Sequence, residues 1–286
     1  MKPAPFDYHR PEDLQGALAL LGTYEGASII AGGQSLVPMM NYRLAQPDHL
    51  IDINRLSELD YIRDEDDCIV IGALARHKAV ESSALISQHL PLVSHAYEWI
   101  AHSAVRNRGT LCGNLCHADP ASEMPAIVQV LEATLVLASA AGTREVAATD
   151  FFVGTYETLR NEDEMLVEVR IPKPAIGTGW GFEEVSMRKG DFAWTAAACT
   201  LRLDGGVLQD VRVAAAGVGA SAMRLRGVET ALAGQTPSEK LFEEVAEVEA
   251  AALEPFGSTS VSADYKRDLC RALVPRVLNA AIERAS

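Results

Sequence analysis

The chain lacks the features that mark several large classes of protein. Its 25 Lys and Arg residues are outnumbered by 39 Asp and Glu, and a net charge of −14 leaves no basic face for a nucleic acid. No apolar run approaches the ~20 residues that a bilayer-spanning helix needs, and no charged-then-apolar leader opens the chain. We therefore expect no nucleic-acid partner, no membrane span and a cytoplasmic location.

Cysteine is also scarce, with five residues that are odd in number and scattered along the chain. A disulfide framework is therefore not expected. Cys112 and Cys116, followed by His117, raise the alternative of a metal site, but their spacing matches neither zinc nor iron–sulfur patterns. We expect no metal on this chain, and interpret the two thiols as small side chains that pack in a tight loop beside a ligand.

Two glycine loops are the most informative features that the sequence does contain. The first, 30–36, reads Ile-Ala-Gly-Gly-Gln-Ser-Leu and follows a strand-like run; the second begins at Gly109 and includes a Gly-Asn pair at 113–114. Glycine lets backbone N–H groups approach an anion closely, and successive N–H groups neutralise it. Each loop alone is also compatible with an ordinary tight turn. Together they indicate an extended, phosphate-bearing ligand held between them by amides rather than by Lys and Arg.

The first part of the chain alternates between helical and strand-like patterns. Apolar spacing predicts helices over 12–24, 91–102 and 126–132. A further helix is predicted to follow Ser35, which would cap it, and to run through Met40 to Leu44. Strands are predicted over 28–30, 49–53, 134–138 and 165–171, and a hairpin over 61–71. The Pro- and Gly-rich stretch 172–179 is the best candidate for a domain boundary.

Beyond that stretch, the sequence predicts three strands over 182–188, 195–203 and 207–216, with the Asp204-Gly205-Gly206 turn joining the last two. Two helices follow, over 238–253 and 262–284, with Pro275 as an expected kink in the last. The predicted fold class is α+β: a first domain over 1–175 that carries both glycine loops, then a smaller α+β domain over 180–286 with a three-stranded antiparallel sheet and helices.

At the two loops the chain resembles a known family. Ala31 to Leu36 and Arg106 to Asn114 are similar to the two FAD-binding signatures of the flavoprotein (medium) subunits of molybdenum hydroxylases, a family that includes subunits of xanthine dehydrogenase and aerobic carbon monoxide dehydrogenase. The resemblance continues through 117–123, 188–193 and 265–267, and so covers nearly the whole chain. It implies an FAD-binding domain of the vanillyl-alcohol oxidase type, built of two α+β subdomains.

The resemblance also implies which residues bind FAD. The first loop would hold the diphosphate, and the second would form the opposite wall of the diphosphate and ribityl site, with Glu123 on a ribityl hydroxyl. Apolar contacts would come from residues 100 and 166, and Phe192 would lie near the isoalloxazine ring. The implied cofactor-binding residues are Ala31, Gly32, Gly33, Gln34, Ser35, Leu36, Ile100, Thr110, Gly113, Asn114, Asp119, Glu123, Leu166 and Phe192.

Two of these residues also have a purely structural interpretation. Asp119 can cap its own turn, and the carboxylate of Glu123 can interact favourably with the dipole of the helix that it begins. The sequence also departs from the family pattern at two places. Cys112 stands where relatives have glycine, so we expect ordinary backbone geometry there. Glu183 and Glu184 lie near a position that is often lysine in relatives.

The function that the resemblance implies is electron transfer. The chain would be the FAD-binding oxidoreductase subunit that passes electrons from iron–sulfur clusters to an external acceptor. The [2Fe–2S] clusters would lie on a small partner subunit and the molybdenum cofactor on a large one, in a dimer of heterotrimers. No catalytic residue is expected on this chain. The alternatives are a self-contained FAD-dependent oxidase or dehydrogenase and a non-enzymatic nucleotide-binding module.

Overall fold

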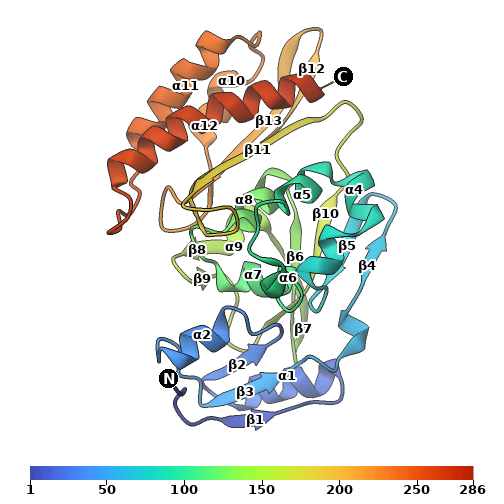
Figure 1. The fold of residues 1–286 in the computed structure, drawn as a ribbon. Coiled ribbons are helices and arrows are strands. Elements are labelled where there is room, and N and C mark those ends of the chain that lie inside the picture. The colour runs from blue at the N-terminus through green and yellow to red at the C-terminus, as the bar shows by residue number, and fades with distance from the viewer. Residues whose placement is uncertain (286) are drawn as a thin grey trace.

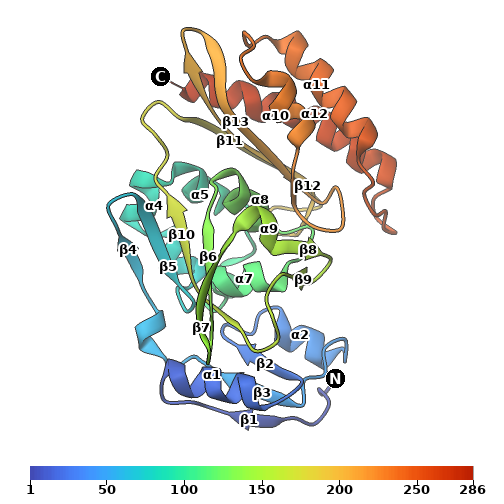
Figure 2. The ribbon, with the colours of Figure 1, turned by 180° about the vertical axis from the view of Figure 1, so that it is seen from behind.

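Three β-sheets follow one another along the long axis of the molecule. The computed structural model describes residues 1–285. Figure 1 shows the N-terminal sheet at the bottom, an antiparallel sheet in the middle and the C-terminal sheet with its helices at the top, and Figure 2 shows the same order from behind. None of the helices in residues 1–285 combines the length and the hydropathy needed to cross a bilayer.

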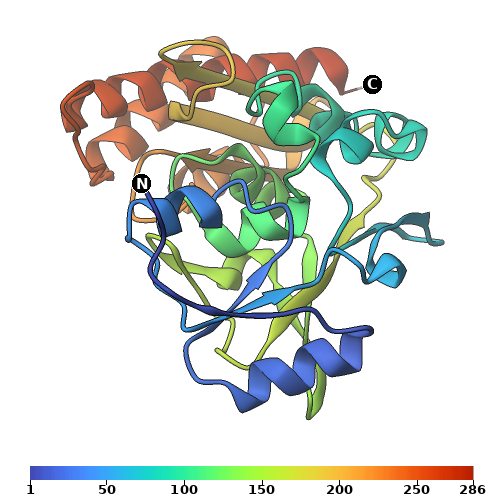
Figure 3. The same cartoon turned by 60° about the horizontal axis from the view of Figure 1, so that its bottom comes forward.

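The first sheet is parallel and has the strand order β1-β3-β2. Its strands are β1 (Asp7–His9), β2 (Ala27–Ile30) and β3 (His49–Asp52), of which β1 was not predicted from the sequence. The predicted first helix is α1 (Leu14–Thr23), at the front of Figure 3. The carboxylate of Asp13 accepts a hydrogen bond from the Gly16 amide, which fixes the start of this helix. Strand β2 of this sheet leads directly into the first glycine loop.

The helix after that loop ends earlier than the sequence indicated. It is α2 (Leu36–Asn41), and the predicted capping role of Ser35 is wrong, because its side chain makes no capping hydrogen bond and its backbone is already helical. The hydroxyl of Ser35 is therefore left for another partner.

The middle sheet is antiparallel throughout, with the order β4-β5-β10-β6-β7. Its strands are β4 (Ile62–Asp64), β5 (Cys68–Gly72), β6 (Thr134–Ser139), β7 (Gly142–Ala147) and β10 (Met165–Pro172). The predicted hairpin over 61–71 is confirmed as β4 and β5. Strand β7 was not predicted, because it lies at the sheet edge with mostly exposed polar residues and lacks apolar alternation. With the first sheet, this layer completes the two α+β subdomains.

Short helices surround the middle sheet. They are η1 (Ser57–Leu59), α3 (His77–Glu81), α4 (Ala84–His89), α5 (Pro91–Ala96), α6 (Ser103–Arg106), α7 (Leu111–His117), α8 (Glu123–Val130) and α9 (Ala148–Phe151), with the small hairpin β8 (Phe152–Gly154) and β9 (Glu157–Thr158).

The helix predicted over 91–102 is confirmed over its first half and wrong over its second. Helix α5 ends at Ala96, and Ala101 has a left-handed backbone with φ +49°, which no α-helix contains. The Arg106 guanidinium donates to the carbonyl oxygens of Ile100 and Ala101 at 2.9 and 2.7 Å. Arg106, on the next helix α6, thus satisfies two carbonyls of the turn that follows α5.

The C-terminal sheet has the order β11-β12-β13-β14. Strands β11 (Gly179–Ser186), β12 (Ala193–Asp204) and β13 (Val207–Ala216) match the three predicted strands, and the short β14 (Met223–Arg224) adds a fourth. Gly205 and Gly206 have φ of +57° and +84°, as the predicted hairpin requires. The two predicted helices are α11 (Glu239–Ala252) and α12 (Ala263–Arg284), which continues through Pro275, while α10 (Arg226–Leu232) was not predicted.

The two faces of this sheet pack against different partners. Its outer face belongs to one core with α11 and α12, whereas Ala196, Ala198, Ala214 and Ala216 on the other face belong to the core of the two preceding sheets. These small side chains let α8 lie close, and every residue of α8 is buried. The Gln129 amide donates to the carbonyl of Ala222 at 2.8 Å across this junction. The sheet therefore closes one end of the region that holds the predicted site.

Candidate functional site

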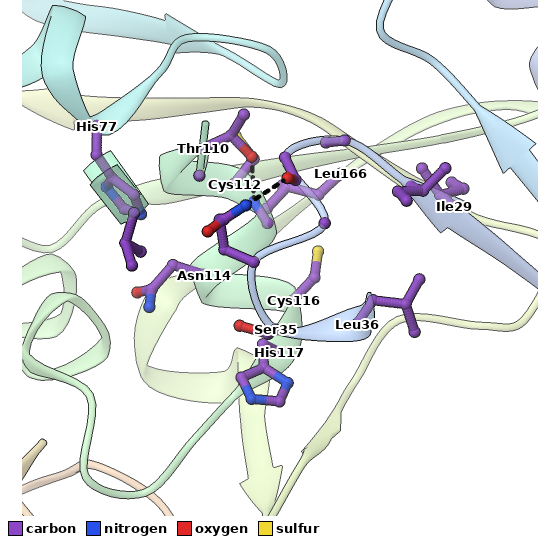
Figure 4. A pocket seen from close by; sticks show the side chains of 18 of the residues that line it. Ile29, Ser35, Leu36, His77, Thr110, Cys112, Asn114, Cys116, His117 and Leu166 are labelled. Atoms are coloured by element: carbon purple, nitrogen blue, oxygen red, sulfur yellow. Dashed lines mark hydrogen bonds between the residues drawn. The ribbon is translucent and has the colours of Figure 1, made fainter. Parts of the chain in front are cut away.

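A cavity of about 570 Å³ lies between the first glycine loop and helix α7, within the size range of small-molecule and cofactor sites. Figure 4 shows Asn114, Cys116 and His117 on α7 next to the segment that carries Ser35 and Leu36. Thirteen of the fourteen residues predicted to bind a cofactor line this cavity. They come from loops about eighty residues apart in sequence, so the fold brings together what the sequence separates.

Close backbone contact joins the two glycine loops. A Cβ atom on Gly32 would lie 2.1 Å from the carbonyl oxygen of Arg108 and 2.7 Å from the Cα of Gly109. Gly33 has φ +68°, a left-handed conformation that side chains rarely adopt. Both glycines are therefore required by the backbone path.

A polar brace that the sequence did not reveal holds this contact. The Arg76 guanidinium donates to the carbonyl of Arg108 and, at 2.6 Å, to the side-chain oxygen of Asn54. The amide nitrogen of Asn54 in turn donates to the carbonyl of Ala31 at 2.7 Å. The brace ties the second loop to the first, but its members are far apart in sequence and form no motif.

The first loop presents unused hydrogen-bond donors. Within residues 1–285, the backbone amides of Gly32, Gly33, Gln34 and Ser35 donate to no acceptor of the chain. Consecutive free amides in a turn of this kind bind anions. This donor set suits a phosphate-bearing ligand.

The cationic side chains of the lining do not replace those amides. Arg160 is the one Lys or Arg among the lining residues, and its guanidinium donates to the carbonyls of Asn161 and Glu164. Burial lowers the pKa of His77 to about 4, so this imidazole is neutral at ordinary pH. An anion here would be held mainly by backbone dipoles, as the charge of the whole chain led us to expect.

The second loop is fixed by its own caps. The Thr110 hydroxyl accepts a hydrogen bond from the Gly113 amide at 3.1 Å and begins α7. The Asn114 side-chain nitrogen donates to the Ser122 hydroxyl at 2.8 Å, which holds the start of α8 against α7. Cys112 lies inside α7 with ordinary helical geometry, and that prediction is confirmed.

The cysteines behave as packing residues. All five are free thiols in this structure. Burial raises the pKa of Cys116 to about 11, so this cavity-lining group is a neutral thiol. Residues 1–285 contain no cluster of three or more His, Cys, Asp or Glu side chains able to hold a metal ion.

Asp119 is the predicted site residue that does not line the cavity as described over residues 1–285. Its carboxylate accepts hydrogen bonds from the Ala121 amide at 2.9 Å and the Tyr156 hydroxyl at 3.2 Å. These contacts match the local turn that was its alternative interpretation, and a direct contact with a cofactor stays a prediction. Tyr156 itself lines the cavity and was not found from the sequence.

The apolar residues of the lining differ in exposure. Ile100 and Leu166 are buried, and His102 and Met165, which the sequence did not indicate, also line the cavity. Phe192 is 57% exposed on the connection between β11 and β12, where the cavity opens to solvent. An aromatic ring bound here would have one edge accessible from outside.

Comparisons with known proteins agree with this geometry. Residues 4–174 match the family described as "FAD binding domain in molybdopterin dehydrogenase", and residues 180–281 match "CO dehydrogenase flavoprotein C-terminal domain". The chain is 40% identical to the carbon monoxide dehydrogenase medium chain of Hydrogenophaga pseudoflava, over all of both chains. It is 37% identical to caffeine dehydrogenase subunit beta of Pseudomonas sp. (strain CBB1), over 99% of this chain and 97% of that one. A solved structure of carbon monoxide dehydrogenase from Hydrogenophaga pseudoflava, lacking the Mo-pyranopterin moiety of its cofactor, superposes with a TM-score of 0.97 at 41% identity over all of both chains.

Proposed function

The chain belongs to the family of FAD-binding medium subunits of molybdenum hydroxylases, and we propose on this premise that its 570 Å³ cavity holds one FAD. It is an oxidoreductase subunit, and electron transfer is its part in such a complex. The observation that supports the FAD site best is the run of free amides from Gly32 to Ser35, because it offers the diphosphate donors without a cluster of cations.

The lining residues fit the parts of FAD in turn. The amides of the first loop and the hydroxyl of Ser35 would face the diphosphate, with Thr110, Gly113 and Asn114 on the opposite wall. When bound, FAD supplies the redox chemistry, and the chain orients it and limits its contact with water.

The other predicted contacts lie toward the two ends of the cavity. Glu123 would accept from a ribityl hydroxyl, and Ile100 and Leu166 would make apolar contacts. The exposed Phe192 would flank the ring at the opening, where electrons can leave for an acceptor outside.

The remaining redox groups are assigned to partner subunits. We propose a small subunit with [2Fe–2S] clusters, a large subunit with the molybdenum cofactor, and a dimer of heterotrimers that reduces an external acceptor. The absence of a metal-binding cluster in residues 1–285 is compatible with this division. Five free cysteines favour a reducing compartment, and we propose the cytoplasm.

We also propose domain limits of 1–175 and 180–286. They are supported by the end of β10 at Pro172 and the start of β11 at Gly179, since each strand belongs to a different sheet. The segment between them carries no strand or helix.

The experiment that tests the proposed function uses the full chain purified alone. It should hold FAD, yet aldehydes, purines, aromatic heterocycles and carbon monoxide should not bleach its absorbance under anaerobic conditions. Dithionite should bleach it, as the control for a competent flavin. Reduction by a substrate should appear only after iron–sulfur and molybdenum subunits are added. Rapid bleaching of the lone chain by one of these compounds would favour a self-contained dehydrogenase, and a chain that takes up no FAD would contradict the proposal altogether.

A further inference from the structure

Two carboxyl groups meet without a cation at the junction of the two domains. Glu123 is the first residue of α8 and lines the cavity, whereas Glu184 lies on β11 of the C-terminal sheet. Both side chains are more than nine-tenths buried, with exposed fractions of 4% and 6%. Burial of a carboxylate is costly unless it is paired or neutralised.

No partner in the described chain neutralises this pair. Neither oxygen of Glu184 has a hydrogen-bond partner within residues 1–285, and neither carboxyl takes part in an ion pair there. The group that faces Glu184 is the carboxyl of Glu123, which can only accept hydrogen bonds when it is ionised. The contact becomes a hydrogen bond if one of the two carboxyls carries a proton.

The surroundings do not supply a compensating charge. The other polar groups around the pair are Asp119 before α8, the phenol of Tyr97 after α5, the hydroxyl of Ser186 on β11, and Lys266 of α12, whose charge acts on Asp119. Burial, and then the neighbouring carboxylate, raises the pKa of Glu123 to about 8. Burial raises the pKa of Glu184 to about 7. A buried carboxyl pair of this kind titrates as one unit.

We propose that Glu123 and Glu184 share one proton, and that this proton couples FAD binding to pH. Glu184 is a positioning residue: its carboxylate accepts the hydrogen bond that protonated Glu123 donates, and the other oxygen of Glu123 is left for the ligand. When the shared proton is lost at higher pH, two like charges face each other where the C-terminal sheet closes the cavity. FAD retention therefore decreases as the pH rises above about 8. The idea rests on the proposed FAD site.

The test compares FAD binding by the full-length wild type, Glu184→Gln and Glu183→Gln, measured by flavin fluorescence between about pH 6 and pH 9. The glutamine amide can accept a hydrogen bond from protonated Glu123 and donate one to ionised Glu123 without titrating itself, so Glu184→Gln should bind FAD with less than a twofold change over this range. The wild-type dissociation constant should rise by up to tenfold per pH unit above about pH 8. Glu183, on the same strand, pairs with Arg276 at 2.9 Å, and its Gln variant should keep the wild-type profile.

Infrared spectroscopy tests the shared proton directly. Exposed carboxyls are ionised at pH 7, so a protonated-carboxyl band at that pH reports buried acids. The wild type should show this band and lose it as the pH rises past about 8. A wild type without the band at pH 7 would overturn the proposal, even if Glu184→Gln failed to fold. So would a Glu184→Gln variant with the wild-type pH dependence. A wild type that bound no FAD at any pH would instead contradict the proposed function. The infrared band would still show whether Glu123 and Glu184 share a proton.

Discussion

Replacing Gly32 with alanine should separate the two glycine loops and weaken FAD binding. The added Cβ would lie 2.1 Å from the carbonyl oxygen of Arg108, 2.7 Å from its carbonyl carbon and 2.7 Å from the Cα of Gly109. All three atoms belong to the backbone, so no side chain can rotate away. Since ordinary contact begins at 3.4 Å, the loops must move apart by about 1.3 Å. The brace from Arg76 and Asn54 opposes that movement.

The cost of such overpacking is about 1–3 kcal/mol. If this free energy destabilises only the FAD-bound state of the chain, FAD affinity decreases about 5- to 150-fold. A fluorescence titration of the flavin-free chain measures this change, with circular dichroism to verify that the variant is folded. Gly22→Ala in α1 is the matched control, because nothing lies within 4 Å of its added Cβ, and its FAD affinity should stay within twofold of wild type. Wild-type affinity in a folded Gly32→Ala variant would refute the reasoning.

Three further changes have distinct expected outcomes. Gly33→Val should abolish FAD retention, because valine is strained at φ +68° and its Cβ would meet Val37 at 3.1 Å; the flavin absorbance should vanish while limited proteolysis still yields a folded C-terminal fragment. The double variant Cys112→Ala/Cys116→Ala should keep most of its FAD, and metal analysis of the wild-type chain should find no stoichiometric zinc or iron. Gly181→Ala should lower the melting temperature in calorimetry by about 2–4 °C for each kcal/mol lost, because its Cβ would lie 2.1 Å from the carbonyl oxygen of Val277 in α12.

Local patterns explain why much of the fold could be predicted. Strands such as β12 and β13 alternate small or apolar residues toward two buried faces, and a Gly-Gly turn joins them. The misses have physical reasons. Strand β7 is polar and β14 has two residues, so neither carries a pattern. The helix predicted over 91–102 ends at Ala96, and beyond it Ala101 has a left-handed backbone whose carbonyl is bound by Arg106, a residue outside that window.

The candidate site also has a part that the sequence predicts and a part that it does not. Each glycine loop is a continuous segment of the sequence, so the residues that it contributes to the cavity could be predicted. The brace of Asn54 and Arg76 depends on contacts between distant segments. Glu184 stood out in the sequence only as a departure from the family pattern, and its meeting with Glu123 depends on the tertiary packing of the C-terminal sheet against α8. What the sequence lacks is information on which distant side chains face each other.

The charge of the chain explains why the cavity depends on backbone dipoles and on a proton. A net charge of −14 disfavours an anionic ligand, but charges more than about 8–10 Å away are largely screened at physiological salt. The groups within that distance decide, and there the free amides of the first loop supply positive potential. Against it stand two buried carboxyls that form no ion pair within residues 1–285. If both were ionised, they would oppose the amides at the same cavity. One shared proton halves that charge, so the acid pair is compatible with an anionic ligand only while the proton is held.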